Sequence, residues 1–157
     1  MEANEQKGHR IKKRTMPESI NITTPLPSKN GTGLSGEYFV AAELYRRGFS
    51  VGMTIGNAKS IDILAEKDGK VIQIQVKAIF RKQSVGWNMN DHSLLDHILY
   101  VLVNLNSWEQ PDYYILTAKE IRKYHKQYVG RGILDLSKAK KLNCLDRWDK
   151  LEPNKKK

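Results

Sequence analysis

The middle of the chain reads Ser60-Ile61-Asp62-Ile63-Leu64-Ala65-Glu66-Lys67-Asp68-Gly69-Lys70-Val71-Ile72-Gln73-Ile74-Gln75-Val76-Lys77, which predicts two β-strands joined by a tight turn. Asp68-Gly69 is a strong signal for a two-residue hairpin turn because both positions tolerate a positive φ. With these two residues in the turn, Lys67 pairs with Lys70, and the pairing continues outward from there. The sequence therefore predicts a β-hairpin with a defined register.

That register places Asp62 opposite Gln75 and Ser60 opposite Lys77. Because side chains alternate between the two faces of a strand, Asp62, Gln75 and Lys77 emerge together on one face. The other face carries only apolar side chains: Ile61, Ile63, Ala65, Ile72, Ile74 and Val76. We therefore expect one face to build a core and the other to hold a functional site with a carboxylate, an amide and an ammonium group.

The charge of the chain indicates its partners. It has 157 residues, with 27 Lys and Arg against 17 Asp and Glu, a net charge of +10 and a pI near 9.7. This surplus favours binding to a polyanion, with nucleic acid as the first candidate and an anionic membrane surface as the second. The alternative is that the positive surface only keeps the protein soluble.

The cysteine content and the apolar runs of the sequence predict where the protein is located. Cys144 is the only cysteine, so a disulfide framework or thiolate metal site is not expected, and a reducing compartment fits best. The amino terminus lacks an apolar signal region, and the longest apolar run, residues 98–103, is too short to span a bilayer. We expect a cytoplasmic protein with no membrane segment.

Composition divides the chain into three parts. Residues 1–33 are predicted to be a flexible basic arm, 34–150 a single domain, and 151–157 a Lys-rich tail. Basic residues between Lys7 and Arg14 would contact phosphates nonspecifically, or they belong to a merely solvated tail.

The first helix is predicted from Ser35, a candidate N-cap, to Arg47, with Gly48 ending it. Its inward stripe is formed by Leu34, Glu37, Val40, Ala41, Leu44 and Tyr45. An inward-facing carboxylate needs a cation, a hydrogen-bond donor or a metal as its partner. For Glu37 we favour such a functional role over the alternative, that its charge only compensates the helix dipole in the first turn.

The other elements follow from apolar runs and turn residues. Strands are predicted over 49–55, 98–105 and 113–116, with a turn at 56–58 and a long polar connection over 79–97 in which Trp87 closes the core rather than stacking on a base. Thr117 with Glu120 forms a capping box that opens a basic helix through Tyr128. A short helix over 137–142 and an anchoring Trp148 complete the domain.

The polar face of the hairpin matches the needs of phosphodiester hydrolysis. Mg²⁺ takes oxygen ligands, keeps several waters and needs only one or two carboxylates. Asp62 supplies a carboxylate oxygen, Gln75 an amide oxygen and Val76 a backbone carbonyl. Lys77 would orient the attacking water or neutralise phosphate charge, and Glu37 would add a second carboxylate.

Three segments, Gly36-Glu37, Ser60-Ile61-Asp62 and Gln75-Val76-Lys77, resemble the motifs of the PD-(D/E)XK nuclease superfamily. Two features depart from its pattern, since Gln75 replaces the usual acidic residue and Ser60-Ile61 stand where a proline region would be. Gln-x-Lys versions occur in Mrr-like restriction nucleases and in a small group of homing endonucleases.

The resemblance covers roughly residues 35–128 and implies an α/β (α+β) fold, with a restriction-endonuclease-like αβββαβ core and a mixed central sheet flanked by helices. It also implies a Mg²⁺-dependent DNA endonuclease of restriction, homing or junction-resolving type, with Mn²⁺ as a substitute metal and a homodimer as the working form. The metal would be held by Glu37, Asp62, Gln75 and Val76.

Two other functions remain open. The first is a catalytically silent DNA-binding module on the same fold, within a larger defence or repair complex, because an amide binds metal less strongly than a carboxylate. The second is association with RNA or a membrane surface through the basic tails. The expected phosphate contacts in the domain are Arg81, Lys82, Lys123, Lys126 and Arg131.

Overall fold

The computed structural model describes residues 25–54, 60–81 and 85–152. Its elements are α1 (Lys29–Arg46), β1 (Ser50–Met53), β2 (Ile63–Lys67), β3 (Lys70–Ile79), β4 (Gly86–Asn88), η1 (Asp91–Ser93), β5 (Ile98–Asn104), β6 (Asp112–Thr117), α2 (Ala118–Tyr124), β7 (Lys126–Tyr128), β8 (Arg131–Asp135), α3 (Leu136–Ala139) and η2 (Trp148–Leu151). The predicted turn at 56–58, most of the basic arm, and residues 153–157 of the tail lie outside the described residues.

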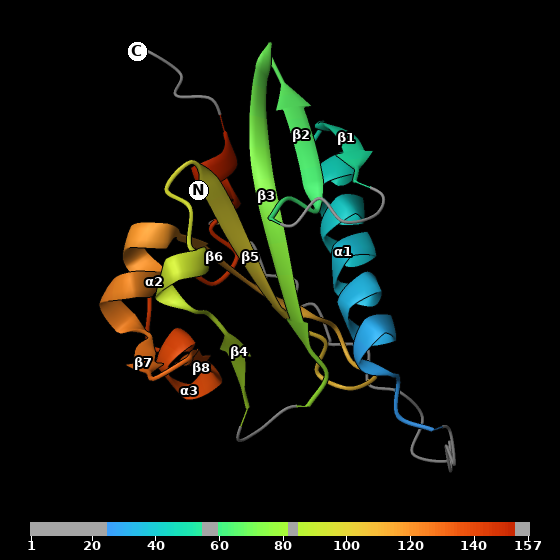
Figure 1. Cartoon of the computed structure of the whole chain (residues 1–157). Coiled ribbons are helices and arrows are strands. Elements are labelled where there is room, and N and C mark those ends of the chain that lie inside the picture. Colours follow the sequence, from blue (N-terminus) through green and yellow to red (C-terminus); the bar gives the residue numbers. More distant parts are fainter. Residues whose placement is uncertain (1–24, 55–59, 82–84, 153–157) are drawn as a thin grey trace, which may run out of the picture.

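A five-stranded mixed sheet with order β1-β2-β3-β5-β6 forms the centre of the fold, and a three-stranded sheet β4-β8-β7 lies beside it (Figure 1). β3 and β5 are parallel, whereas the other neighbours in the large sheet are antiparallel. Helix α1 packs on one face through Val40 and Leu44, and α2 packs on the other through Ile121. The predicted mixed sheet flanked by helices is thus confirmed.

The connection from β3 to β5 contains β4 and a 3₁₀ turn, and α2 follows β6. The prediction of one long polar connection over 79–97 was therefore wrong in part. Trp87 of β4 is 1% exposed and donates from its indole N–H to the Val103 carbonyl at 3.2 Å. This confirms that Trp87 closes the core.

The hairpin turn forms as predicted. Asp68 and Gly69 have φ values of 52° and 76°, and the ladder runs from Lys67↔Lys70 to Ile63↔Ile74. An aspartate tolerates the left-handed conformation and glycine adopts it at no steric cost, so the turn sets the register. Ile63 and Ile74 are fully buried beneath α1.

Helix α1 begins seven residues before the predicted start. Its N-cap is Ser28, whose hydroxyl accepts a hydrogen bond from the Gly31 N–H at 3.0 Å, so the prediction of Ser35 was wrong. The i, i+4 row of buried residues is Thr32, Gly36, Val40 and Leu44, with Ala41 beside it. Leu34 and Tyr45, predicted to face inward, are 43% and 60% exposed.

The basic helix α2 ends earlier than predicted. The capping box of Thr117 and Glu120 is present, but the helix stops at Tyr124, and residues predicted as its last turn form β7. β7 and β8 pair across a turn that contains Gly130, with φ 71°. Strand pairing with β8 overrides the local helical pattern here.

The carboxyl-terminal segment returns to the main sheet. Trp148 is 4% exposed and lies in the α1-side core, as predicted, and so does fully buried Leu151. The short helix predicted over 137–142 forms as α3, one residue earlier and ending at Ala139. No helix of the described segments is long and apolar enough to cross a membrane.

Candidate active site

The hairpin leaves its predicted register at Asp62. The ladder ends at Ile63↔Ile74, and the Asp62 N–H donates to the Ile74 carbonyl at 2.9 Å. This bond shifts the chain by one residue, so the predicted pairs Asp62–Gln75 and Ser60–Lys77 do not form. Ile61, predicted to share the apolar face of the hairpin with Ile63 and Ile74, packs instead against the core on the α2 side.

The Asp62 side chain replaces a backbone carbonyl in the ladder. If β2 had continued towards its amino-terminal side, a backbone carbonyl would have accepted the hydrogen bond that the Asp62 carboxylate accepts. Its Oδ2 accepts a hydrogen bond from the Val76 N–H at 2.7 Å. Because the N–H and C=O of a strand residue leave on the same side, the Val76 carbonyl also points towards this gap beside β3. The carboxylate and the carbonyl predicted as metal ligands are therefore adjacent.

Thr54 fixes the segment that carries Asp62. Its N–H donates to the Asp62 carbonyl at 3.0 Å, and its hydroxyl donates to the Ile61 carbonyl at 2.6 Å. Thr54 was not among the predicted site residues, since a threonine at the end of a strand carries no distinctive signal. It acts as a positioning residue for Asp62.

Glu37 reaches the same place from α1 because the helix lies very close to β3. A Cβ on Gly36 would lie 2.5 Å from the Cβ of Ala78, so only glycine permits this approach without a shift. Burial raises the pKa of Glu37, the charge of Asp62 raises it further, and the charge of Lys77 opposes both. The fold thus brings Glu37, Asp62 and Lys77 into one electrostatic cluster.

Asp62 is in a similar electrostatic position. Burial raises its pKa, while the hydrogen bond from the Val76 N–H and the charge of Lys77 lower it without cancelling the effect of burial. Ionisation of Glu37 and of Asp62 is therefore unfavourable in the folded protein, and a bound cation would stabilise the charged form of both carboxylates.

The donor set fits a hard divalent cation. The described residues include no group of three His, Cys, Asp or Glu side chains that would hold a metal alone. Oxygen atoms of Asp62, Glu37 and Val76, completed by water, match what Mg²⁺ or Mn²⁺ requires. Gln75 is half-buried on β3 opposite Tyr100, and its amide makes no hydrogen bond within the described part of the chain.

We expect an Asp62→Asn variant to be more stable than wild type at neutral pH in EDTA. A carboxyl group with a raised pKa in the folded state contributes stability below its unfolded pKa, and this contribution is lost as pH rises through the folded pKa. The advantage of Asp62→Asn should therefore shrink as pH falls towards about 4, near the ordinary value for aspartate.

Urea unfolding of both proteins at the two pH values measures this difference. Asp68→Asn, which changes an exposed carboxylate in the hairpin turn, is the matched control and should show no such advantage. A constant gap between Asp62→Asn and wild type at both pH values would contradict the expected result.

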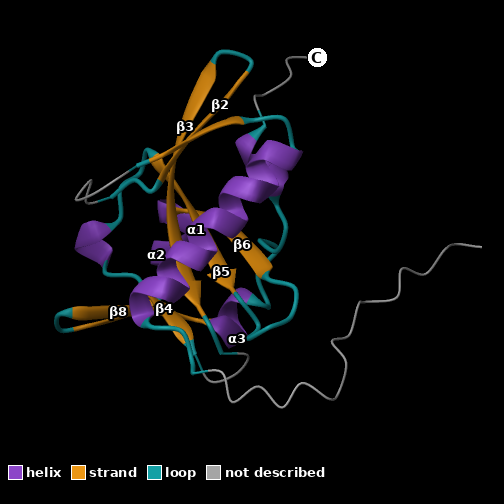
Figure 2. Cartoon of the chain, turned by 90° about the vertical axis from the view of Figure 1, so that its right-hand side faces the viewer, coloured by secondary structure: helices purple, strands orange, loops and turns teal. Residues whose placement is uncertain are grey.

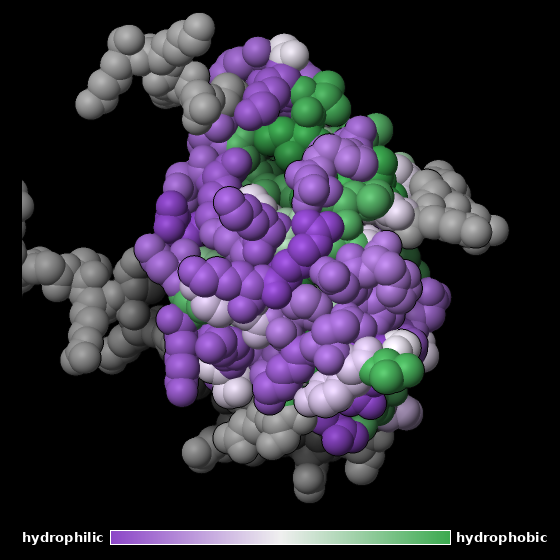
Figure 3. Space-filling model, turned by 60° about the vertical axis from the view of Figure 1, so that its left-hand side comes forward, coloured by the Kyte–Doolittle hydropathy of each residue, from purple (hydrophilic) through white to green (hydrophobic). Residues whose placement is uncertain are grey.

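The predicted phosphate contacts occupy several places. Arg81 is exposed two residues after the end of β3, and Lys82 lies outside the described residues. Lys123 of α2 lies over the Tyr124 ring, Lys126 of β7 is 2.9 Å from Asp135, and Arg131 is exposed on β8. Hydrophilic side chains predominate on the face shown in Figure 3.

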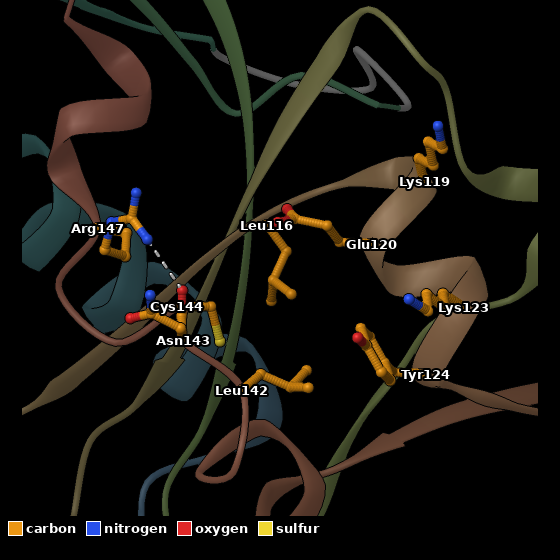
Figure 4. A pocket seen from close by; sticks show the side chains of 9 residues that line it. All are labelled: Leu116, Lys119, Glu120, Lys123, Tyr124, Leu142, Asn143, Cys144 and Arg147. Atoms are coloured by element: carbon orange, nitrogen blue, oxygen red, sulfur yellow. Dashed lines mark hydrogen bonds between the residues drawn. The ribbon is translucent and has the colours of Figure 1, made fainter.

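A hollow of about 460 Å³ lies between α2 and the segment around Cys144 (Figure 4). Burial raises the pKa of the Cys144 thiol to about 11, so it stays protonated at neutral pH and is a poor nucleophile. Glu120 on its wall is held by Lys150 at 2.8 Å.

The five-stranded mixed sheet with α1 against β3 defines an endonuclease-like α/β fold. Among solved structures, the chain is similar to the bacterial homing endonuclease I-Ssp6803I, with a TM-score of 0.53 and 16% sequence identity. The match covers 69% of this chain and 75% of that one. No protein-family model matches the sequence, and no curated protein matches it.

Proposed function

We propose that the chain is a divalent-metal-dependent endonuclease that hydrolyses phosphodiester bonds in DNA. The observation that carries the proposal is the cluster around Asp62, immediately before β2 begins. There the carboxylate of Asp62 is fixed by the Val76 N–H and interacts with the charges of Glu37 and Lys77. The cluster lies on a fold shared with a homing endonuclease, and the net charge of +10 suits a polyanionic substrate.

Each residue has a role in this proposal. Asp62 and Glu37 would hold Mg²⁺ or Mn²⁺, with the Val76 carbonyl and the Gln75 amide oxygen as further ligands. The bound metal supplies an activated water and neutralises phosphate charge. The ammonium group of Lys77 orients the attacking water or the phosphate and stabilises the negative charge that develops there. Cutting both strands of a duplex needs two such sites, so a homodimer is the expected working form.

The proposal is tested by offering the protein several DNA forms with Mg²⁺ or Mn²⁺. Duplex, single-stranded, branched and modified DNA are incubated with wild type, Asp62→Asn and the control Asp68→Asn. Wild type and Asp68→Asn should cleave at least one form, and Asp62→Asn should cleave none at a comparable rate. Equal cleavage by wild type and Asp62→Asn would reject this site.

A catalytically silent DNA-binding module is the second candidate. The observation in its favour is Gln75, whose amide replaces a carboxylate and weakens a metal site. Such a module would bind DNA but show no metal binding at Asp62 and no cleavage.

A further inference from the structure

A hollow of about 800 Å³ opens at the end of β3, the strand that carries Val76 and Lys77. Ile79 of β3 lines it. Because strand side chains alternate, Ile79 shares its face with Lys77 and lies about 7 Å further along. A polymer that contacts Lys77 would therefore reach this hollow within one or two of its repeating units.

The hollow is lined by groups that suit a phosphate backbone. Arg131 and Lys140 supply two exposed positive charges, and Asn88 and Ser137 supply polar side chains. The guanidinium group of Arg131 makes no ion pair with any residue that the structure describes. Arg131, Ser137 and Lys140 come from β8 and the segment at α3, which are remote in sequence from the β2–β3 hairpin. Asn88 comes from β4, which follows β3 in the chain.

One carboxylate, that of Asp135, also lines the hollow. Its Oδ2 accepts a hydrogen bond from the Lys126 ammonium group at 2.9 Å. This ion pair neutralises the only negative charge among the lining residues, so the hollow as a whole is positive. Lys126 therefore acts on the hollow through Asp135.

The strands of the small sheet that lines the hollow pack closely against one another. A Cβ on Gly86 would lie 2.6 Å from the Leu134 carbonyl oxygen, and one on Gly132 would lie 2.0 Å from the Met89 carbonyl oxygen. The Gly132 N–H donates to the Asn90 side chain at 2.5 Å. The turn between β7 and β8, at one end of this sheet, projects from the body of the molecule (Figure 2).

We infer that this hollow binds the phosphodiester backbone of duplex DNA beside the bond that is cleaved, through Arg131 and Lys140, with Lys126 screening Asp135. This inference rests on the proposed function, because it names where the substrate of that site continues. Charge complementarity identifies the occupant, since the wall is positive and the whole chain carries +10.

The test measures binding of a fluorescein-labelled linear duplex in EDTA by fluorescence anisotropy at several salt concentrations. Arg131→Ala and Lys140→Ala should each weaken binding and reduce the slope of log K against log salt by about one. Lys70→Ala removes an exposed charge from the opposite end of β3, about 30 Å away, and should leave the slope unchanged. Thermal melting verifies that each variant folds.

A charge-swap pair tests the role of Lys126. Lys126→Ala should weaken binding because it exposes Asp135, and the double variant Lys126→Ala/Asp135→Asn should recover most of the lost affinity. A double variant as weak as the single one would show that Lys126 contacts DNA directly and would overturn the screening role.

The outcomes separate this inference from the proposed function. Unchanged salt slopes in Arg131→Ala and Lys140→Ala, or no DNA binding by wild type, would overturn the inference. Wild type that binds through these residues yet cleaves no DNA would support the inference and reject the nuclease. Cleavage of DNA by wild type, together with unchanged salt slopes in Arg131→Ala and Lys140→Ala, would support the nuclease and reject the inference.

Discussion

Lys77→Ala is expected to cleave DNA at least about 100-fold more slowly than wild type while binding DNA with similar affinity. The charge of Lys77 acts on Glu37 and on Asp62, the two carboxylates of the cluster. In the proposed reaction it stabilises charge that develops at the phosphate, so its loss affects the rate more than binding.

The pH dependence of the variant gives a second, independent measurement. Lys77 lowers the pKa of both carboxyl groups, so its removal should raise both values. Any residual cleavage by Lys77→Ala should therefore fall off at a higher pH than wild-type cleavage does. Lys70→Ala, at the start of the same strand, should cleave like wild type. A Lys77→Ala variant that cleaves at the wild-type rate would remove Lys77 from the site.

Gly36→Val is expected to lower the free energy of unfolding by about 1–3 kcal/mol, the usual cost of overpacking a core. A Cβ at this position would lie 2.5 Å from the Cβ of Ala78 and 3.6 Å from a methyl group of Val76, so α1 or β3 must shift. The same shift would move Glu37 away from Asp62 and reduce cleavage.

Gly33→Val in the same helix provides the control. A Cβ there meets no atom within 4 Å, and valine is no worse than glycine as a helix former. Urea unfolding of the two variants compares the sites directly. Equal stability of Gly33→Val and Gly36→Val would show that the close approach of α1 to β3 is not required.

The hairpin could be predicted from the sequence because its determinants are local. Asp68 and Gly69 specify the turn by their backbone conformations, and alternation then separates the core face from the polar face. Glu37 could be found for a similar reason. Its carboxylate lies in line with Ala41 and Leu44 on one helix, and a charged group in an otherwise apolar stripe requires a cation, a hydrogen-bond donor or a metal.

The break at Asp62 could not be predicted, because it depends on contacts distant in sequence. Thr54 and the backbone of Ile74 draw the chain out of register. The Asp62 carboxylate then accepts the hydrogen bond from Val76 that a continuing strand would have accepted. The site residues were thus predicted from a pairing that does not form, although the charge of Lys77 still acts on the Asp62 carboxylate.

The small sheet was missed for a related reason. The capping box fixes where α2 begins, because Thr117 and Glu120 are close in sequence. Its end is set by β7 pairing with β8, and by Gly132 packing against Met89, neither of which leaves a local pattern. As a result Arg131 was predicted as one of five phosphate contacts from its charge alone, without Lys140 or the hollow that Arg131 and Lys140 share.

The central claim, that Asp62 belongs to a divalent metal site, is tested most directly by thermal melting of the protein alone with increasing Mg²⁺. A ligand that binds only the folded state stabilises it by about 2.7 kcal/mol at a hundredfold excess over Kd. Mg²⁺ should therefore raise the Tm of wild type and of Asp68→Asn by several degrees, and leave the Tm of Asp62→Asn unchanged. The same Mg²⁺ response in all three proteins, or no response in wild type, would contradict the claim.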